Sequence, residues 1–466
     1  MGLPQASGAR TTTPRRAEAT ALGSAGARRW DAVLLWLLVA VVLLAPLPLG
    51  SNRPLPASAL ATAVGALLCV WGARCLIAPS PATLPMRPFW PALVLLGLAA
   101  AWAAVQALPV TPQGLHHPYW RDAQEVLGLS DAGAISVNPG ATRSRLMGLL
   151  AYGGIFWLAL HLGRPSARAH QVLLALAGGG LLYAAYGLVQ AFGSETGVTS
   201  TFVNRNSYAT YAGMTLLCGL GLVLRGFARE ARAGLSLRAT VLEMLARLDA
   251  RLPVGVITCL VAGSALLLTQ SRGALVALCA AFVAFLASLR RMALVTSSTF
   301  FKAAAVSSVG LLVGIVGLAG EETLGRFAQA DVQASNRLAY YRTTLEAIRD
   351  RPLLGTGYGT YADAFRAYNH PGTGTYFLDK AHNTYLQMAM ELGWPAAAAL
   401  YSGLALLVLG CLRGQGGVWP AVLVSCSMLV AVHSLVDFSL EMPANAATYA
   451  LLLGIGCAQS VRGSPA

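Results

Sequence analysis

The chain has 466 residues, of which 56% are hydrophobic and only 11% are charged. Soluble domains contain about 25% charged residues, so this composition excludes a water-soluble globular protein and indicates an integral membrane protein. The formal net charge is +14, and most basic residues fall between apolar runs, where they hold loops in the cytoplasm. The charge therefore sets the topology and does not indicate a nucleic-acid partner.

Twelve apolar runs are long enough to cross about 30 Å of hydrocarbon. They lie at Ala32–Leu49, Ala57–Ile77, Phe89–Leu108, Leu146–Leu162, Gln171–Phe192, Tyr208–Leu224, Val254–Thr269, Ala274–Leu289, Phe300–Ala319, Ala396–Leu412, Val418–Val436 and Ala444–Ala458. These runs predict an all-α polytopic membrane protein with about twelve transmembrane helices.

The segments around these runs complete the expected organisation. Residues 1–30 are polar and lack apolar periodicity, which is typical of a disordered tail. Residues 31–319 would form helices 1–9, residues 320–383 a large, partly helical outer loop, residues 384–460 helices 10–12, and residues 461–466 a second tail. The placement of Lys and Arg predicts that both tails are cytoplasmic.

The outer loop is far longer than a connection between two helices requires. Helix formers over Asn336–Asp350 predict a helix that Pro352 ends. The glycine-rich run Leu353–Thr360 resembles a phosphate-binding loop only superficially, because no predicted strand precedes it and no Lys-Ser or Lys-Thr pair follows it. We interpret this run as a tightly packed turn.

Two arginines stand at the outer ends of apolar runs. Arg205 lies between two asparagines, and Arg272 occupies the short turn Gln270–Gly273. Either arginine could snorkel to lipid headgroups, but snorkelling arginines are expected mostly on the cytoplasmic side. Together with a loop arginine, Arg337 or Arg342, they would bind a dianionic group, because guanidinium stays charged and binds phosphate oxygens in pairs. A lipid diphosphate suits such a site.

The sequence gives no reason to expect a metal or another cofactor. It contains no Asp-x-Asp pair, and the outer acidic residues are scattered, so we expect arginines to stabilise the diphosphate. The eight cysteines include no Cys-x-x-Cys pair and lie mostly within apolar runs. We interpret them as small buried residues.

His382 is the best candidate for a general base. It precedes Asn383 and the expected helical stretch Tyr385–Met390, which leads into the next apolar run, so it also lies at the outer face. Nearby positive charge favours the neutral ring that a base requires.

The other histidines receive structural interpretations. His433 and Asp437 lie one turn apart near the end of an apolar run, where we expect a structural pair. His116 and His117 are adjacent in a polar segment, and we expect an exposed pair in a loop.

Several motifs together resemble the O-antigen ligase and polymerase superfamily. They are Phe202–Asn206 (FVNRN), Thr269–Ala274 (TQSRGA), Arg337 with Arg342, Pro352–Tyr358 (PLLGTGY), Ala381–Gln387 (AHNTYLQ), Glu391–Gly393 (ELG) and His433–Asp437 (HSLVD). The motifs span about residues 200–440. The preceding residues are similar to the family only in forming apolar runs.

The resemblance implies a bacterial inner-membrane glycosyltransferase of the metal-independent, largely helical type, with a large periplasmic loop. Such an enzyme moves a glycan from undecaprenyl diphosphate to an acceptor hydroxyl. His382 matches the proposed base of the family, and Arg205, Arg272 and either Arg337 or Arg342 match its diphosphate-binding positions. The supporting candidates are Asn206, Asn383, Tyr341 and Glu391.

The resemblance leaves the acceptor open. Another lipid-linked repeat would make the protein a polymerase, lipid A-core would make it a ligase, and a protein acceptor would make it an oligosaccharyltransferase. The FVNRN and HSLVD forms favour a surface polysaccharide polymerase, for exopolysaccharide or the O-antigen of lipopolysaccharide. Its partners would be the lipid-linked donor, a glycan or lipid A-core acceptor, membrane lipids and the polysaccharide assembly machinery.

A transporter or flippase of lipid-linked glycan is the rival from a different class. Transporters usually hold ionisable groups near the middle of the membrane, in broken helices. The apolar runs of this chain are nearly free of charge, and the ionisable groups gather at the outer face. This pattern favours an enzyme that acts at the membrane surface.

The expected mechanism places a geometric demand on the fold. The loop Gly320–Asn383 must fold back over the two turns that carry arginine. We therefore expect Arg205, Arg272 and His382 to face a common cavity at the outer membrane surface.

Overall fold

The computed structural model describes residues 14–77, 87–128, 133–192, 197–231, 251–291, 338–368, 378–414 and 417–461. Within these ranges the chain consists of helices and turns and contains no β-strand. The expected all-α class is confirmed for this part of the chain.

Helices cover most of each expected apolar run within these ranges, and α1 begins at Pro14, within the tail that was expected to be disordered. The long ones are α1 (Pro14–Leu44), α2 (Pro54–Ile77), α3 (Trp90–Gln106), α5 (Pro139–Leu162), α6 (Ser166–Ala191), α7 (Arg205–Ala231), α9 (Arg251–Leu268), α10 (Arg272–Arg291), α15 (Trp394–Arg413), α16 (Val418–His433) and α17 (Pro443–Ser460). The ninth expected run, Phe300–Ala319, lies outside the described residues.

Six helices in the described ranges are long and apolar enough to cross a membrane. They are α2, α5, α6, the Arg205–Arg225 part of α7, α10 and α15. α3, most of α9 and α16 are apolar but shorter. These helices support a polytopic membrane protein, while the count of about twelve spans stays a prediction.

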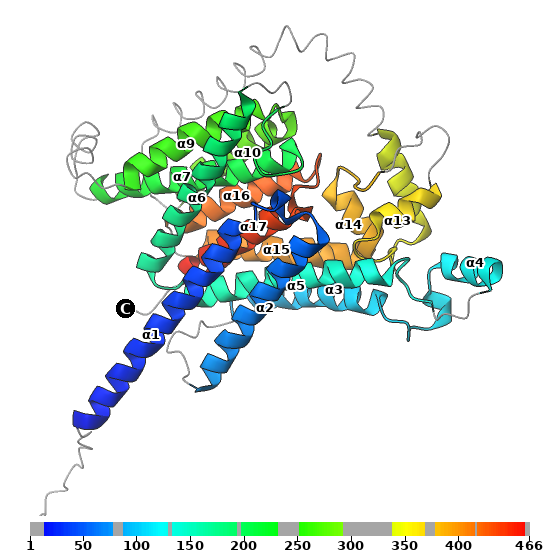
Figure 1. The fold of residues 1–466 in the computed structure, drawn as a ribbon, viewed down its shortest axis with the longest axis horizontal. Helices are drawn as coiled ribbons and strands as arrows, with labels where there is room; N and C mark the ends of the chain where they lie inside the picture. Colours follow the sequence, from blue (N-terminus) through cyan, green and yellow to red (C-terminus); the bar gives the residue numbers. More distant parts are fainter. Residues whose placement is uncertain are drawn as a thin grey trace, which may run out of the picture.

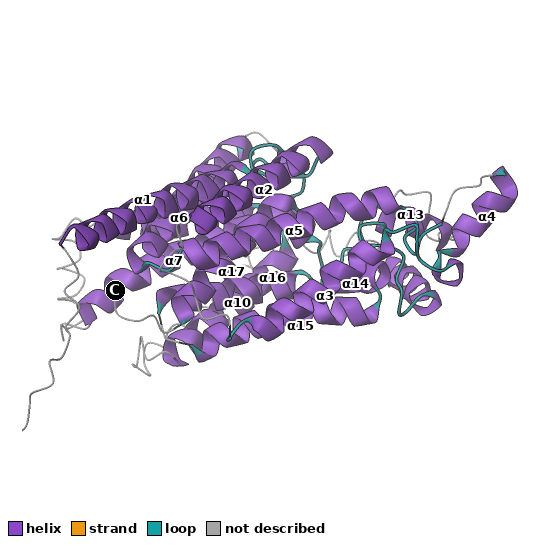
Figure 2. Ribbon diagram, turned by 90° about the horizontal axis from the view of Figure 1, so that it is seen from below, coloured by secondary structure: helices purple, strands orange, loops and turns teal. Residues whose placement is uncertain are grey.

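Shorter helical elements connect the long ones. They are α4 (Pro118–Leu127), α13 (Tyr361–Phe365), α14 (Thr384–Leu392), the 3-10 turns η1 (Leu49–Ser51), η2 (Gln113–Leu115), η3 (Arg366–Tyr368) and η5 (Ser439–Glu441), and a helix over residues 338–350. The last of these confirms the described part of the helix expected before Pro352. Figures 1 and 2 show α4 and α13 beyond one end of the long helices, with α14 beside the helix ends there.

α17 forms the centre of the bundle (Figure 1). Nearly all of its residues are buried, and it packs against α1, α5, α15 and α16. Helices within lipid associate through close packing, which small residues allow. At Gly454 of α17, an added Cβ atom would lie 2.5 Å from the carbonyl oxygen of Phe156 in α5. The two backbones therefore approach so closely that no methyl group fits between them.

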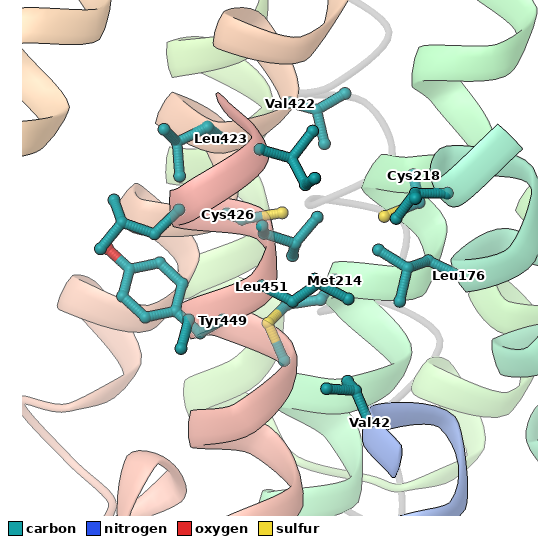
Figure 3. Packing of buried hydrophobic residues seen from close by; sticks show 14 of the residues in the cluster. Val42, Leu176, Met214, Cys218, Val422, Leu423, Cys426, Tyr449 and Leu451 are labelled. Atoms are coloured by element: carbon teal, nitrogen blue, oxygen red, sulfur yellow. The ribbon is translucent and has the colours of Figure 1, made fainter. Parts of the chain in front are cut away.

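Apolar side chains of α17 interdigitate with those of four neighbouring helices, as Figure 3 shows. They include Val42 of α1, Leu176 of α6, Met214 and Cys218 of α7, Val422, Leu423 and Cys426 of α16, and Tyr449 and Leu451 of α17. The Tyr449 hydroxyl donates a hydrogen bond to Ser427 Oγ at 2.9 Å. The polar end of this buried ring is thereby satisfied.

The helix ends predicted to face the cytoplasm meet at one end of the bundle. Gln459 Nε2, in the last turn of α17, donates to Gly163 O at 2.8 Å. Arg291 Nε, at the end of α10, donates to Leu412 O of α15 at 3.2 Å. The structure thus brings together segments that the distribution of basic residues assigns to one side.

The helix ends predicted to face outward meet at the opposite end. Val198 N donates to Leu268 O, at the end of α9, at 3.1 Å. Gln106 Nε2, at the end of α3, donates to Leu354 O in the glycine-rich turn at 2.7 Å. The chain therefore passes back and forth as expected, and the side of the membrane that each end faces stays a prediction.

The close contact between α17 and α5 gives a stability prediction. We expect Gly454→Ala to destabilise the protein by about 1–3 kcal/mol, because the added methyl must displace the α5 backbone. Gly410→Ala in α15 is the matched control, since no atom lies within 4 Å of a Cβ placed there. Thermal unfolding in detergent, followed by tryptophan fluorescence, compares the two. Equal melting temperatures would contradict the contact.

Candidate active site

Hydrogen bonds from separate elements fix the loop that carries His382. Tyr341, on the helix over residues 338–350, donates its hydroxyl to the His382 carbonyl oxygen at 3.0 Å. Thr384 Oγ1 donates to the carbonyl oxygen of Asp437 at 2.9 Å. The loop is thus attached both to the outer-loop helix and to the segment that follows α16.

The backbone of His382 is held in an uncommon conformation. Its φ of 53° lies in the left-handed region, which costs a residue with a side chain about 1–2 kcal/mol. Such a conformation persists only where the surroundings determine it. The imidazole packs edge-on against Phe438 with ring centroids 5.0 Å apart, and its side chain is 27% exposed. One part of the ring therefore remains accessible to another molecule.

The buried carboxylate of Asp437 faces the His382 ring. His382 Nδ1 lies 3.9 Å from Asp437 Oδ1, which is within reach of an ion pair but longer than a hydrogen bond. No hydrogen-bond partner for Nδ1 occurs among the described residues. Burial alone would raise the pKa of Asp437, but interactions with His382, His433 and Ser439 outweigh burial and lower it. The ring therefore faces an anionic carboxylate at neutral pH.

Asp437 also connects α7 to the segment between α16 and α17. Ser439 Oγ donates to Asp437 Oδ2 at 2.7 Å, and Asn206 Nδ2 lies 3.4 Å from Asp437 Oδ1. Ser439 Oγ is also 3.1 Å from His433 Nδ1. The expected pair of His433 and Asp437 is therefore linked through a serine hydroxyl, and Asp437 has a second histidine partner in His382.

Both outer arginines begin helices that meet this segment. Arg205 is the first residue of α7 and directly precedes Asn206. Arg272 is the first residue of α10, and a Cβ on the next residue, Gly273, would lie 3.4 Å from His433 Nε2. The structure thus places both arginine turns beside the segment that contains Asp437.

Helix stability does not explain why arginines occupy these two positions. The N-terminus of a helix carries partial positive charge, so a cation there is unfavourable and an anion is favourable. Arg205 and Arg272 are both exposed, and each adds a full positive charge to a helix end that already attracts anions. The arrangement is chemically suited to hold a phosphate group.

The structure describes only part of the outer loop. Arg342 is exposed on the helix over residues 338–350, next to Tyr341. Arg337 lies outside the described residues. The described part of the loop does contact the segment that Asp437 occupies, through His382 and Thr384. A common cavity for Arg205, Arg272 and His382 stays a prediction.

Two of the supporting candidates have local structural tasks. Asn383 is the N-cap of α14, where its side chain accepts a hydrogen bond from Leu386 N at 3.1 Å. Glu391 is fully buried and accepts hydrogen bonds from Gly359 N at 2.7 Å and Tyr361 N at 3.2 Å. Glu391 therefore braces the glycine-rich turn, which the structure shows to be tightly packed.

A second buried carboxylate, Glu441, lies next to the candidate site and was not identified from the sequence. Its Oε2 atom lies 2.5 Å from Arg145 Nη2 and 2.5 Å from Lys380 Nζ. An acidic residue beside an apolar run indicates that a cationic partner exists. That signal was present for Glu441, but it does not identify the partner.

The expectation of an exposed His116–His117 pair is wrong, because His116 is half-buried and His117 is buried. The larger departure is at His117. Its side chain is only 3% exposed, because the loop folds beneath the start of α4, where the His117 ring accepts a hydrogen bond from Tyr119 N at 3.3 Å. Burial, and then the charge of Arg351, lower the pKa of His117 to about 4. The ring is therefore a neutral helix cap, in agreement with a structural role.

The structure buries four of the eight cysteines, in agreement with their interpretation as small buried residues. Cys218, Cys411, Cys426 and Cys457 are buried, whereas Cys69 is exposed on α2. Across the described ranges, no group of three or more His, Cys, Asp or Glu side chains is placed to hold a metal ion.

Comparison with known families agrees with this geometry. A family model described as O-antigen ligase matches residues 257–401, which include Arg272, the helix over residues 338–350 and His382. Arg205 and Asp437 lie outside the matched segment. No curated protein matches the chain. The family match supports the O-antigen ligase and polymerase superfamily, so the resemblance seen in the sequence is confirmed.

The pKa of Glu391 gives a prediction for stability as a function of pH. Burial and the nearby Glu441 raise this pKa from 4.5 to about 7, although Lys380, the Gly359 N–H group and Arg145 lower it. Between pH 4.5 and about pH 7, the unfolded state has lost the Glu391 proton and the folded state retains it. The free energy of unfolding therefore falls as the pH rises through this range. Glu391→Gln cannot titrate.

We therefore expect the melting temperature of Glu391→Gln, relative to the unmodified protein, to increase from about pH 5 to about pH 7.5. His117 also changes protonation in this range, and its effect on stability has the opposite sign. This effect is the same in both proteins, so it cancels in the difference between their melting temperatures. A difference that does not change with pH would show that Glu391 is already ionised throughout the range.

Proposed function

We propose that this membrane protein of the O-antigen ligase and polymerase type transfers or polymerises glycan at the periplasmic face of the bacterial inner membrane. The donor would be a glycan on undecaprenyl diphosphate, and the acceptor a hydroxyl group. The observation that carries the proposal is the meeting of three chain segments around Asp437: the His382 loop, the start of α7 with Arg205, and the start of α10 with Arg272.

His382 would act as the general base. Since its Nδ1 atom faces Asp437, Nε2 is the atom left to accept a proton from the acceptor hydroxyl. The hydroxyl oxygen then forms a bond to the anomeric carbon while the bond from that carbon to the diphosphate oxygen breaks, which inverts the anomeric centre. Asp437 would orient the ring and stabilise the imidazolium that forms, as the carboxylate does in a catalytic triad.

The arginines would stabilise the departing diphosphate. Negative charge grows on that group as the glycosidic bond breaks, and guanidinium groups fixed around it lower the energy of the transition state. Arg205 and Arg272 would supply two of these groups, and Arg337 or Arg342 a third. With the charge balanced in this way, the reaction would require neither a metal nor another cofactor.

A polysaccharide polymerase is the acceptor class that the FVNRN and HSLVD motifs favour. A ligase to lipid A-core and a protein oligosaccharyltransferase are alternatives with the same chemistry. A transporter would need ionisable groups along a path through the membrane, whereas Arg205, Arg272, His382 and Asp437 lie at helix ends or in loops.

The first test removes the proposed base and one diphosphate-binding residue. We expect His382→Ala and Arg272→Ala to reduce glycan elongation by about 100- to 10,000-fold, the range for loss of a general base or a charge-stabilising group. Cells that lack the native gene and express each variant would be compared by the length of their surface glycan on gels. Arg349→Met, which removes an exposed cation of the loop helix, is the control. Normal glycan from both variants at normal expression would refute the assignment.

A second test concerns Asp437. We expect Asp437→Asn to reduce the rate by about 100-fold or more, because the amide retains the shape but cannot stabilise an imidazolium. Ser439→Ala should cost less, since it removes one hydrogen bond to a carboxylate that remains charged. If the two substitutions have equal effects, Asp437 acts only as a structural residue.

A third experiment distinguishes the acceptors. Purified protein in lipid vesicles would be incubated with lipid-linked glycan extracted from cells that lack this protein. A polymerase produces a ladder of lipid-linked chains from this material alone. A ligase or a protein oligosaccharyltransferase shows transfer only after lipid A-core or a protein acceptor is added, and a flippase moves the glycan across the vesicle without changing its length.

A further inference from the structure

An ionic cluster attaches the chain just before His382 to η5 and α5, and none of its members touches the reacting atoms in the mechanism proposed above. Glu441, whose side chain is only 4% exposed, accepts hydrogen bonds from Arg145 and from Lys380, each at 2.5 Å. Arg145 Nη1 also lies 3.3 Å from the Glu441 carbonyl oxygen. The cluster therefore joins α5, the outer loop and η5 at one carboxylate.

Lys380 and Glu441 flank the two members of the His382–Asp437 pair. Lys380 lies two residues before His382, and Glu441 lies four residues after Asp437. Because His382 Nδ1 and Asp437 Oδ1 are 3.9 Å apart, no direct hydrogen bond sets their separation. The hydrogen bond from Thr384 to Asp437 attaches the chain after His382 to this segment, and the short, charged contact between Lys380 and Glu441 attaches the chain before His382. The two attachments together can set that separation.

The geometry does not favour Lys380 as a ligand of the diphosphate. Its side chain is only 20% exposed, and its ammonium contacts a buried carboxylate. The next backbone group, Ala381 N, donates to Gln387 Oε1 of α14 at 3.1 Å. The side chain therefore points toward the interior cluster, while the exposed arginines are better placed to meet an anion.

We propose that Lys380 is a positioning residue, which through Glu441 holds the left-handed His382 loop at its working distance from Asp437. Arg145 in turn attaches Glu441 to α5. This inference rests on the proposed function of His382 but concerns a different interaction. The two can therefore fail separately.

The role of Lys380 can be tested by a substitution that leaves the rest of the cluster intact. In Lys380→Met the Glu441 carboxylate keeps its contact with Arg145, so no buried charge loses all of its partners. The protein should fold, and the loop should lose one attachment. Lys380→Arg keeps a cation that can reach Glu441, and Arg349→Met removes an exposed cation elsewhere in the loop as the matched control.

The kinetic experiment uses the purified full chain in vesicles, with lipid-linked glycan extracted from cells that lack it. We expect Lys380→Met to lower kcat by about 10- to 100-fold with little change in KM for the donor, because displacing a reactive group by about 1 Å has an effect of this size. Lys380→Arg should restore at least a third of the normal rate, and Arg349→Met should behave as the unmodified protein. A higher KM with an unchanged kcat would instead make Lys380 a donor-binding residue and overturn the inference.

Hydrogen–deuterium exchange supplies a readout that does not depend on activity. We expect amides in residues 380–386 to exchange several-fold faster in Lys380→Met than in Arg349→Met, while amides of α17 remain unchanged. Unchanged exchange in the loop would overturn the positioning role even if the rate fell. Full activity of His382→Ala would refute the proposed function, and the exchange result would still decide whether Lys380 holds the loop.

If Lys380→Met does not fold, Lys380→Gln is the second variant. It retains a hydrogen-bond donor but loses the charge, and the same loss of kcat and faster loop exchange are expected. A normal kcat together with normal amide exchange in the loop of Lys380→Gln would overturn the inference.

Discussion

Charged groups are costly in hydrocarbon unless they are paired, and this constraint decides where the protein can carry out chemistry. The ionisable residues of the site lie where helices end, and the segment between α16 and α17 contains two buried carboxylates with separate partners. Asp437 faces His382 and accepts a hydrogen bond from Ser439. Glu441 holds Arg145 and Lys380. The remaining parts of the site are arranged around these two anions.

The core of the bundle supports this segment directly. α17 begins two residues after Glu441 and runs through the centre of the packed helices. In its first turn, Asn445 Nδ2 donates to Ser439 O at 3.0 Å and to Ser207 O of α7 at 2.8 Å. A reactive group needs support from rigid neighbours to keep its geometry. Here α17, whose residues are nearly all buried, supplies that support.

The sequence predicted the parts of this structure that depend on local pattern. Apolar runs locate helices because length and composition alone decide whether a segment can span lipid. The motif around His382 and the turn around Arg272 could be found because their neighbours are adjacent in the chain. The order of the apolar runs along the chain also indicated that His382 and Arg272 lie at the same outer end of the bundle.

The pairing of charges could not be predicted in the same way. Arg145 and Glu441 are 296 residues apart, and no periodicity links positions so distant. Asp437 has an obvious local partner in His433, so its second partner, His382, was not evident. Glu391 was assigned to the site from its motif, but its carboxylate points into the glycine-rich turn. Each of these arrangements is set by tertiary packing and not by neighbouring residues.

The left-handed backbone at His382 has a consequence for how this protein can change over time. Glycine adopts that conformation without steric cost, and asparagine adopts it more readily than most residues. The hydrogen bonds of the loop at this position use backbone atoms, so glycine would retain them and relieve the strain. Against that relief, glycine would lose the packing of the imidazole on Phe438 and its interaction with Asp437. The backbone at this position therefore favours glycine, and only the side chain favours histidine, so a histidine here is retained for what its ring does.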